Sequence, residues 1–406
     1  VLLEPEDDFF KDPSWSSLGV DWKKELSPFY RTASTMLGRA VNPAHGIMDD
    51  YLRNTAERMG ALSTFGPTPN GIYFGRSGVT HPDPYFKGKG PSREGCRFCG
   101  ECLTGCRYGS KNSLDKNYLY LAEKNGAIIL TSRRVENIAP QQDGSYCLSL
   151  KDSSRRFSGS VSLRAGRVIL AAGVQGTLEL LFRCRDEAGS LPNISRQLGK
   201  VVRTNSEAVV GALSPDKNLD LSRGTTISSH FYPDRHTHIT QNRFPPGYTF
   251  MKWYTGPLVN DPRPFRRSMK TFAQMILYPV KLLRVWFARG WYRRVVVLTV
   301  MQNLDNRIAF EFGRSFFLPF SGKKLKSRRI PGREAPTNLP AANRAAQLLA
   351  EEMGGTPMNV IMESAFNQST TAHILGGCHM GTGPENGVID TGHEVFGYPG
   401  LYVMDG

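Results

Sequence analysis

The chain has 406 residues, of which 40% are hydrophobic and 21% are charged, a composition that is ordinary for a globular protein and argues against a disordered polypeptide. No apolar run reaches the roughly 18 residues that a membrane-spanning helix needs, so the sequence predicts no such helix. The net charge of +15 favours an anionic partner, such as nucleic acid, an acidic membrane surface or a phosphate-rich cofactor.

The N-terminal part predicts two helices followed by loops. Amphipathic patterns cover residues 21–36 and 49–59. Residues 66–95 are rich in Gly and Pro and show little periodicity, which indicates a loop-rich excursion. Because the chain starts at Val1 and not at Met, we expect it to be a processed chain or a fragment.

Four of the seven cysteines lie close together, at Cys96, Cys99, Cys102 and Cys106. Their spacing is that of a ferredoxin-type [4Fe–4S] ligand run, except that Arg107 stands where a proline is usual. The four thiolates could equally hold zinc, and a third interpretation is that they are free cysteines packed as small apolar side chains. Such crowded cysteines do not suit a disulfide framework, so we expect a reducing compartment.

Residues 109–205 have the most regular pattern, in which helices alternate with apolar strands. Asp143-Gly144 between two strand-like runs predicts a hairpin turn. Gly173-Val-Gln-Gly176 closes a strand and opens a helix; such glycines let backbone N–H groups approach a phosphate, or serve only the tight turn. The order of elements is typical of an α/β nucleotide-binding layer, with a helix at 112–124, a strand at 127–130, hairpin strands at 135–138 and 146–150, a strand at 167–172 and a helix at 177–185.

From about residue 206 to 370 the pattern indicates a mixed or antiparallel sheet. Residues 263–294 interleave Arg and Lys with aromatic side chains. This segment would suit anionic lipid headgroups or single-stranded nucleic acid, or it forms a solvated basic face over buried aromatic rings. Strands at 295–301 and 308–312 and a helix at 341–353 follow.

The C-terminal part carries the most informative residues. His373 stands just before the paired glycines Gly376 and Gly377, which would let a ligand lie against the backbone beside the imidazole. A buried strand is predicted at 401–404, and the turn Asp405-Gly406 follows it directly. Acidic-Gly turns at strand ends commonly contact ribose, ribityl or pyrophosphate groups.

Three stretches together resemble the glucose–methanol–choline (GMC) oxidoreductases. The first is His373-Ile-Leu-Gly-Gly-Cys-His-Met-Gly with Leu401-Tyr-Val-Met-Asp-Gly, and the others are Gly105-Cys-Arg-Tyr-Gly-Ser-Lys-Asn-Ser-Leu and Leu170-Ala-Ala-Gly-Val-Gln-Gly-Thr. Within the family, Leu191-Pro-Asn-Ile and its surroundings most resemble the cholesterol-oxidase branch, whose FAD is bound non-covalently. The similarity covers nearly the whole chain and is loosest over residues 210–340.

The resemblance assigns roles to individual residues. Val135 matches the residue whose backbone contacts the adenine of FAD, and Gly173, Asp405 and Gly406 match positions that line the cofactor. His373 matches the histidine beside the flavin that takes or orients the proton of the substrate hydroxyl. An imidazole with a pKa near neutrality suits that role while hydride leaves the carbinol carbon for the flavin.

The sequence also departs from the family pattern. The Gly-x-Gly-x-x-Gly turn for the FAD pyrophosphate is expected upstream of Val1, and the Asn or His that partners His373 is expected downstream of Gly406. No Glu occurs between Glu207 and Glu311, where cholesterol oxidases carry the glutamate that moves the steroid double bond. Isomerase activity is therefore not expected.

The predicted fold is an α/β flavoprotein, in which an FAD-binding Rossmann-like domain is interleaved with an α+β substrate domain that has a mixed or antiparallel sheet. The substrate domain is expected to roof the flavin with its sheet. The expected segments are residues 1–108 (substrate domain, with the Cys segment), 109–205 (FAD-binding), 206–385 (substrate domain) and 386–406 (FAD-binding, truncated).

The resemblance implies an enzyme that oxidises the hydroxyl of a sterol or bulky lipid alcohol to a ketone and passes hydride to FAD. One alternative is a flavin dehydrogenase whose [4Fe–4S] cluster passes electrons to an acceptor other than oxygen. Another is a truncated, inactive flavoprotein or a lipid-binding module. We expect a cytoplasmic protein that contacts a membrane peripherally through residues 263–294, and no nucleic-acid partner.

Overall fold

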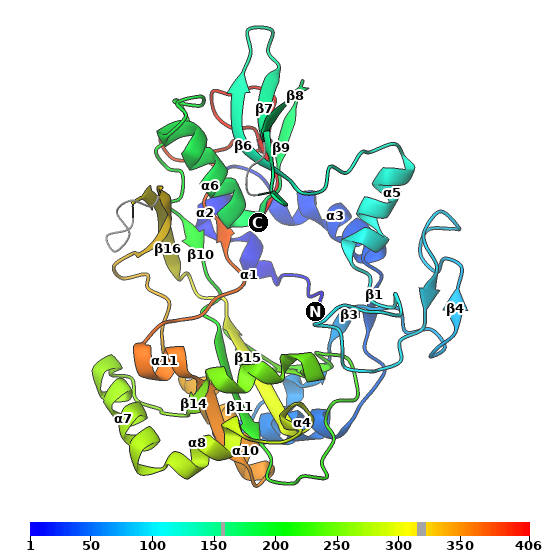
Figure 1. The fold of residues 1–406 in the computed structure, drawn as a ribbon, viewed down its shortest axis with the longest axis vertical. Helices are drawn as coiled ribbons and strands as arrows, with labels where there is room; N and C mark the ends of the chain where they lie inside the picture. Colours follow the sequence, from blue (N-terminus) through cyan, green and yellow to red (C-terminus); the bar gives the residue numbers. More distant parts are fainter. Residues whose placement is uncertain (156–158, 315–321) are drawn as a thin grey trace.

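A computed structural model of the chain describes residues 1–155, 159–314 and 322–406. The elements form two halves along the long axis, and both ends of the chain lie near the middle (Figure 1). The upper half contains the predicted nucleotide-binding layer, and the lower half contains the largest sheet. Because segments far apart in sequence meet in each half, the chain passes between the halves several times.

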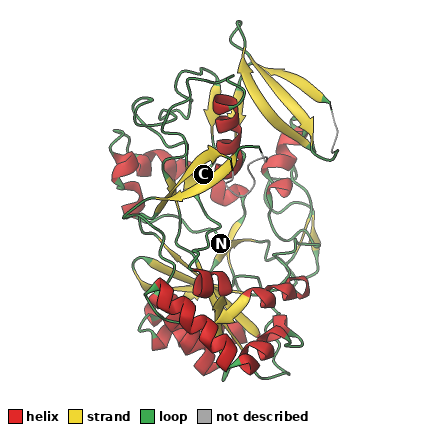
Figure 2. Ribbon diagram, turned by 60° about the vertical axis from the view of Figure 1, so that its left-hand side comes forward, coloured by secondary structure: helices red, strands yellow, loops and turns green. Residues whose placement is uncertain are grey.

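The upper half is built around one helix and two small sheets. One sheet is antiparallel and projects from the body of the molecule (Figure 2). The other sheet is parallel and pairs Val403 with Leu170, so segments more than half the chain apart lie side by side. The elements are α6 (Gly173–Asp186), the antiparallel strands β6 (Arg133–Pro140), β7 (Tyr146–Asp152) and β8 (Ser160–Ala165), and the parallel strands β9 (Val168–Leu170) and β20 (Leu401–Val403).

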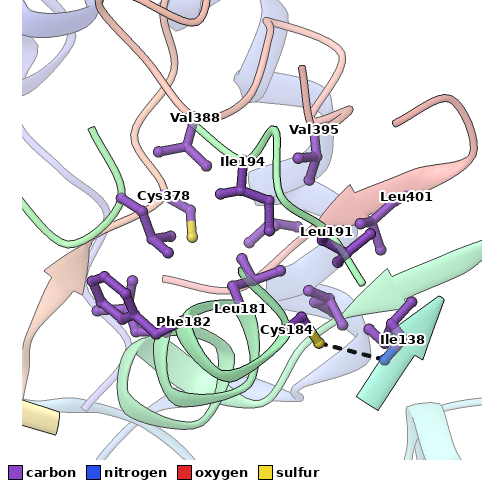
Figure 3. Close-up of a cluster of buried hydrophobic side chains, with 14 of the residues drawn as sticks. Ile138, Leu181, Phe182, Cys184, Leu191, Ile194, Cys378, Val388, Val395 and Leu401 are labelled. Atoms are coloured by element: carbon purple, nitrogen blue, oxygen red, sulfur yellow. Dashed lines mark hydrogen bonds between the residues drawn. The ribbon is translucent and has the colours of Figure 1, made fainter. Parts of the chain in front are cut away.

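Apolar side chains from these elements form the core of the upper half (Figure 3). Leu181 and Phe182 of α6 pack among residues of the C-terminal segment, including Val388 and Leu401. The buried Cys184 accepts a hydrogen bond from the backbone N–H of Ile138, with Sγ and N 3.4 Å apart. The C-terminal segment is thus held to α6 and β6 by burial of apolar surface.

The lower half contains an antiparallel seven-stranded sheet with helices on both faces. Side chains alternate along its strands, so that Val296 and Leu298 pack toward one core cluster and Val295 and Val297 toward another. The first cluster includes helices α4 (Ile47–Arg58) and α10 (Pro340–Glu352), and the second includes α8 (Pro279–Trp286) and α9 (Trp291–Arg294). The strands, in spatial order, are β14 (Thr255–Pro257), β18 (Thr356–Val360), β11 (Ala208–Leu213), β15 (Val295–Gln302), β13 (Thr237–Asn242), β12 (Ser229–Asp234) and β2 (Gly66–Pro67).

The remaining elements lie between the halves or at the periphery. A four-stranded sheet lies at one side, in the order β17 (Lys324–Arg329), β16 (Arg307–Gly313), β10 (Val202–Arg203) and β19 (Leu375–Gly376). The N-terminal helices are α1 (Asp7–Phe10), α2 (Pro13–Ser16) and α3 (Trp22–Met36). Further elements are β1 (Arg39–Val41), η1 (Leu62–Thr64), β3 (Pro69–Gly71), β4 (Thr80–His81), β5 (Arg93–Glu94), η2 (Leu114–Lys116), α5 (Tyr118–Lys124), η3 (Pro246–Tyr254), α7 (Pro264–Leu277), α8 (Pro279–Trp286), α9 (Trp291–Arg294) and α11 (Ile361–Phe366).

Most of the predicted elements are confirmed. The helices near residues 21–36 and 49–59 and the helix near 341–353 are present, as are the hairpin around Asp143-Gly144 and the strands near 295–301 and 308–312. The mixed α/β class with antiparallel sheets is also confirmed. Among the described residues, no helix combines the length and apolar character needed to cross a bilayer. The division into domain segments stays a prediction.

Two predictions in the nucleotide-binding layer are wrong. Residues 127–130 form no strand; Ile128 is 85% exposed, and no neighbouring strand among the described residues pairs with it. The single helix expected over residues 112–124 is divided into η2 and α5, because Asn117 between them has φ −133° and ψ −98°. The helix predicted at 177–185 is present but begins earlier, because Gly173 is already the first residue of α6.

Candidate active site

A cavity of about 420 Å³ lies between the upper half and the N-terminal helices. Its walls come from sequence segments that are far apart. The predicted cofactor residues Asp405 and Gly406 line it, together with the backbone of Gly376. On the opposite side, Phe9 and Trp15 of the N-terminal helices contribute apolar surface. Two of the predicted cofactor residues, Asp405 and Gly406, therefore face the N-terminal helices across this cavity, while Gly173 is not part of its lining.

The parallel pair β9–β20 brings the predicted cofactor positions together. Both strands run in the same direction, so Gly173 after β9 and Asp405 after β20 leave the same edge of the sheet. The two segments are joined by a hydrogen bond from the Thr177 hydroxyl of α6 to the Asp405 carboxylate. Gly173 has φ +70°, in the region that favours glycine, and no atom of the described part of the chain lies within 4 Å of where its Cβ would be.

Several features of this edge fit FAD. The open space at Gly173 leaves the N-terminus of α6 accessible to a phosphate oxygen. Asp405 places a carboxylate where a ribose or ribityl hydroxyl could donate to it. His379 also lines the cavity, and its buried Nδ1 has no hydrogen-bond partner among the described residues, so a bound polar group would satisfy it.

His373 lies three residues before Gly376 and takes part in a compact polar cluster. Its Nδ1 is 3.1 Å from Oε2 of Glu207 and 3.0 Å from Nδ2 of Asn205. The backbone N–H of Ala372 donates to the same Glu207 oxygen at 3.2 Å, and Thr371 donates to Asn205 Oδ1 at 3.0 Å. These contacts fix the imidazole against a loop that leads directly into the cavity.

The pKa values of the two ionisable groups shift in opposite directions. The hydrogen bond with Glu207 raises the pKa of His373 above its ordinary value, against a smaller effect of burial. Burial by itself would raise the pKa of the Glu207 carboxyl, but hydrogen bonds from His373, Ala372 and Asn205 outweigh it and lower that pKa. Glu207 is therefore ionised near neutrality and acts only as an acceptor.

A second buried carboxyl lies close to this cluster. Glu363 of α11 is 6% exposed, and burial raises its pKa to about 8. The charge of Glu207 raises this pKa further, while the backbone N–H of Val209 and the buried Arg267 lower it. At neutral pH Glu363 is therefore mostly protonated and uncharged.

The four-cysteine run lacks the geometry of a metal site. Cys96, Cys99, Cys102 and Cys106 are free and line one small cavity of about 20 Å³. Among the described residues, no three His, Cys, Asp or Glu side chains are arranged to hold a metal ion. Burial also raises the pKa of the Cys96 thiol to about 11, which favours the neutral thiol over the thiolate that a metal requires. Neither the [4Fe–4S] nor the zinc interpretation has support from this arrangement.

One predicted cofactor residue lies away from the cavity, and several residues of the site were not predicted from the sequence. Val135 lies in β6, where it packs against the upper core and does not line the cavity. Asn205 and Glu207 were missed because they stand alone in a segment without a motif. The N-terminal wall was missed as well; Asp12 there makes an ion pair with Arg203, with N–O distances of 3.1 Å.

Comparison with known proteins identifies the family of the chain. Two models of the GMC oxidoreductase family match residues 91–197 and 331–406. A cholesterol oxidase from Acinetobacter baumannii is 38% identical over 416 aligned positions, which cover 100% of this chain and 74% of that protein. A long-chain-alcohol oxidase from Arabidopsis thaliana, FAO4B, is 23% identical over 336 positions, covering 76% of this chain and 42% of that protein. The fold of an FAD-dependent oxidoreductase from Chaetomium thermophilum superposes with a TM-score of 0.51 at 12% identity, covering 99% of this chain and 79% of that one.

Proposed function

The chain belongs to the GMC oxidoreductase family and is an FAD-dependent oxidoreductase acting on CH–OH donors, and from this premise we propose that its substrate is a sterol or a similarly bulky lipid alcohol, which it oxidises to the ketone. The likeness to a cholesterol oxidase over the whole chain supports this substrate class. The likeness to a long-chain-alcohol oxidase, although weaker, also supports a lipid alcohol.

The observation that carries the proposal is the cluster of His373, Glu207 and Asn205 next to the cavity that Asp405 and Gly406 line. A carboxylate only accepts hydrogen bonds, so the imidazole proton lies on Nδ1, facing Glu207, and the amide of Asn205 then donates to the Glu207 carboxylate and not to the ring. The other nitrogen, Nε2, is then left as the basic atom for a substrate hydroxyl. This tautomer is the one that a general base in alcohol oxidation needs.

Each residue of the site has a separate role in the proposed reaction. FAD, when bound, supplies the acceptor for the hydride that leaves the carbinol carbon. His373 takes the hydroxyl proton at Nε2, and Glu207 stabilises the imidazolium that results. Asn205, whose Oδ1 accepts from Thr371, donates to Glu207 and so positions the carboxylate that faces the ring. Asp405, Gly406, the N-terminus of α6 at Gly173 and His379 would hold the cofactor, and Val135 would contact its adenine through the backbone.

The test is an absorption spectrum of the FAD-loaded protein without oxygen, before and after addition of a sterol in cyclodextrin. Bleaching of the visible flavin bands is expected, because reduction removes the oxidised chromophore. Bleaching by a long straight-chain alcohol but not by the sterol would contradict the bulky substrate. A spectrum that no alcohol changes would contradict the proposed oxidation as a whole.

We further propose that the enzyme meets its substrate at a membrane surface, through helices α7 and α8 at the outer edge of the lower half (Figure 1). Several of their apolar side chains are strongly exposed, among them Phe265 (75%), Ile276 (77%) and Leu277 (69%). The sequence has no Asp or Glu between Asp261 and Asp305, while basic residues are frequent there. Arg266 and Lys270 of α7 pair with Asp261, whereas Lys281 and Arg284 of α8 have no acidic partner within the parts of the chain that the structure describes. An exposed apolar face beside such unpaired positive charge suits an anionic lipid surface.

A further inference from the structure

We propose that a cationic cavity at one end of helix α8 binds the phosphate of an anionic phospholipid headgroup. This inference rests on the proposed membrane contact and names the lipid that the contact recognises. The cavity has a volume of about 1000 Å³ and lies between the end of β11, helix α8 and helix α9. Two glycines before β18, Gly354 and Gly355, form part of its wall.

The charge of the lining is one-sided. Within residues 1–155, 159–314 and 322–406, five cationic side chains line the cavity and no Asp or Glu does; the five are Lys217, Arg284, Arg289, Arg293 and Arg294. They come from three places in the sequence, namely the loop after β11, helix α8 and the segment through α9. Cations that converge from separate elements repel each other unless an anion lies among them.

Two of the five cations are already engaged. Arg294 is 9% exposed and donates to the carbonyl oxygens of Ser214 and Arg289, with N–O distances of 2.7 to 3.2 Å. Arg293 lies 3.9 Å from a carboxylate oxygen of Asp220. These contacts make Arg294 a part of the cavity floor and reduce the charge that Arg293 offers to a ligand.

The other three cations are free to bind. In the described parts of the chain, Lys217, Arg284 and Arg289 have no acidic group within the 4.0 Å of a salt bridge. Two guanidinium groups and an ammonium match a phosphate group, since guanidinium presents paired N–H donors to two oxygens at once. The free side chains therefore define the ligand chemistry as a phosphate or phosphate ester.

The position of the cavity favours a lipid over a free phosphate. Leu283 and Phe287 of α8 line the same cavity and are 45% and 66% exposed. Through α8 they continue into the exposed apolar face that begins at Val280 and Leu277. A phospholipid has this arrangement of groups, with a charged phosphate next to acyl chains, whereas a free phosphate would leave the apolar side chains in water.

The test measures binding of the FAD-loaded full chain to phosphatidylcholine vesicles with and without phosphatidylglycerol. The variant is the triple substitution Lys217→Gln, Arg284→Gln and Arg289→Gln. The matched control removes the same charge from exposed positions outside the cavity, by the substitutions Arg31→Gln, Arg53→Gln and Arg344→Gln. Of these positions, Arg53 and Arg344 lie on the helices that cover the opposite face of the sheet. Melting temperature and FAD content establish that each variant is folded.

The wild type is expected to bind vesicles with phosphatidylglycerol more tightly than vesicles without it. The cavity variant should lose about a hundredfold in affinity for the anionic vesicles, if each cation contributes as a basic residue does at an anionic surface. The control variant should lose much less. Equal losses for the two variants, or none, would overturn the proposal.

Two further measurements distinguish lipid phosphate from free phosphate, and a wrong phosphate site from a wrong membrane contact. If inorganic phosphate at the concentration of accessible lipid phosphate abolishes the preference, the site takes free phosphate and the lipid assignment is wrong. If the wild type binds neither kind of vesicle, the membrane contact itself is wrong. Flavin reduction by a sterol in cyclodextrin is measured separately on the wild type, so failure of the oxidation is recognised independently of vesicle binding.

Discussion

At the scale of single residues, the cluster around His373 provides the group that would take the proton of the substrate hydroxyl. Replacing His373 by Gln removes the general base and keeps a polar side chain of similar size. We expect kcat to fall by about 10²- to 10⁴-fold, the usual contribution of a positioned base. The measurement is anaerobic flavin reduction in single turnover, with FAD content as the control for cofactor binding. Unchanged turnover would show that another group takes the proton.

Glu207→Gln tests the contact that positions this base. Since Glu207 raises the pKa of His373, the neutral imidazole of the wild type appears at higher pH than it would alone. The variant should therefore shift the acidic limb of the kcat profile to lower pH, and an NMR titration of the His373 ring should report the same direction. Glu311→Gln, at an exposed position in β16, is the matched control and should leave the limb in place. A limb that does not move would rule out the coupling.

Glu363 allows a prediction about stability. The pKa of Glu363 in the folded protein is about 8, which is above the ordinary value of a glutamate. At a pH between that ordinary value and 8, the folded protein therefore holds a proton that the unfolded chain has lost. The free energy of unfolding then falls by up to about 1.4 kcal/mol per pH unit from this group as pH rises. Glu363→Gln removes this dependence, so the variant should gain stability relative to the wild type between pH 5 and pH 7.5, roughly, in urea unfolding. A constant difference would contradict the buried, protonated state.

At the scale of elements, the sequence predicts what is decided locally. The hairpin at Asp143-Gly144 and the amphipathic helices α3, α4 and α10 depend on turn chemistry and periodicity, and they were found. The apolar run Ala127–Leu130 has the same local signal as a strand, but a strand needs a partner, and none of the described strands lies beside it. Pairing is a long-range property that periodicity cannot supply.

The same distinction applies to the site. Asp405-Gly406 and Gly173 were predicted from strand–turn patterns together with family resemblance, and the structure brings their segments together through Thr177. Glu207 could not be found from sequence, because 165 residues separate it from Ala372, to whose N–H it is bonded. The N-terminal helices that wall the cavity also depend on tertiary contacts, such as the ion pair between Asp12 and Arg203.

The packing of α6 against the glycine pair gives a prediction at this scale. Gly377 has φ +86°, and a Cβ there would lie 2.8 Å from a methyl group of Leu178 in α6. Gly377→Ala should therefore destabilise the protein by about 1–3 kcal/mol more than a strained backbone alone. Gly397→Ala is the matched control, since Gly397 has φ +80° but no atom within 4 Å of its Cβ position. Equal losses in thermal unfolding would show that Leu178 can move aside.

At the scale of the whole molecule, two exposed apolar regions differ in their surroundings. Ile276 in α7 is 77% exposed beside basic residues, whereas Ile128 in the upper half is 85% exposed outside that basic segment. Ile276→Ser should weaken binding to phosphatidylcholine vesicles, because apolar burial contributes about 25 cal/mol per Å². Ile128→Ser should leave it unchanged. If both substitutions weaken binding equally, vesicle association does not select the α7–α8 face.

The parallel pair β9–β20 also bears on the stability of the protein. Among the described residues this sheet has only two strands, and Ile169 in its middle is 59% exposed. A coenzyme held at its edge adds stability by mass action, about 2.7 kcal/mol at a free concentration one hundred times its dissociation constant. FAD bound at this edge would thus stabilise the fold as well as accept hydride, and its removal should lower the melting temperature of the protein.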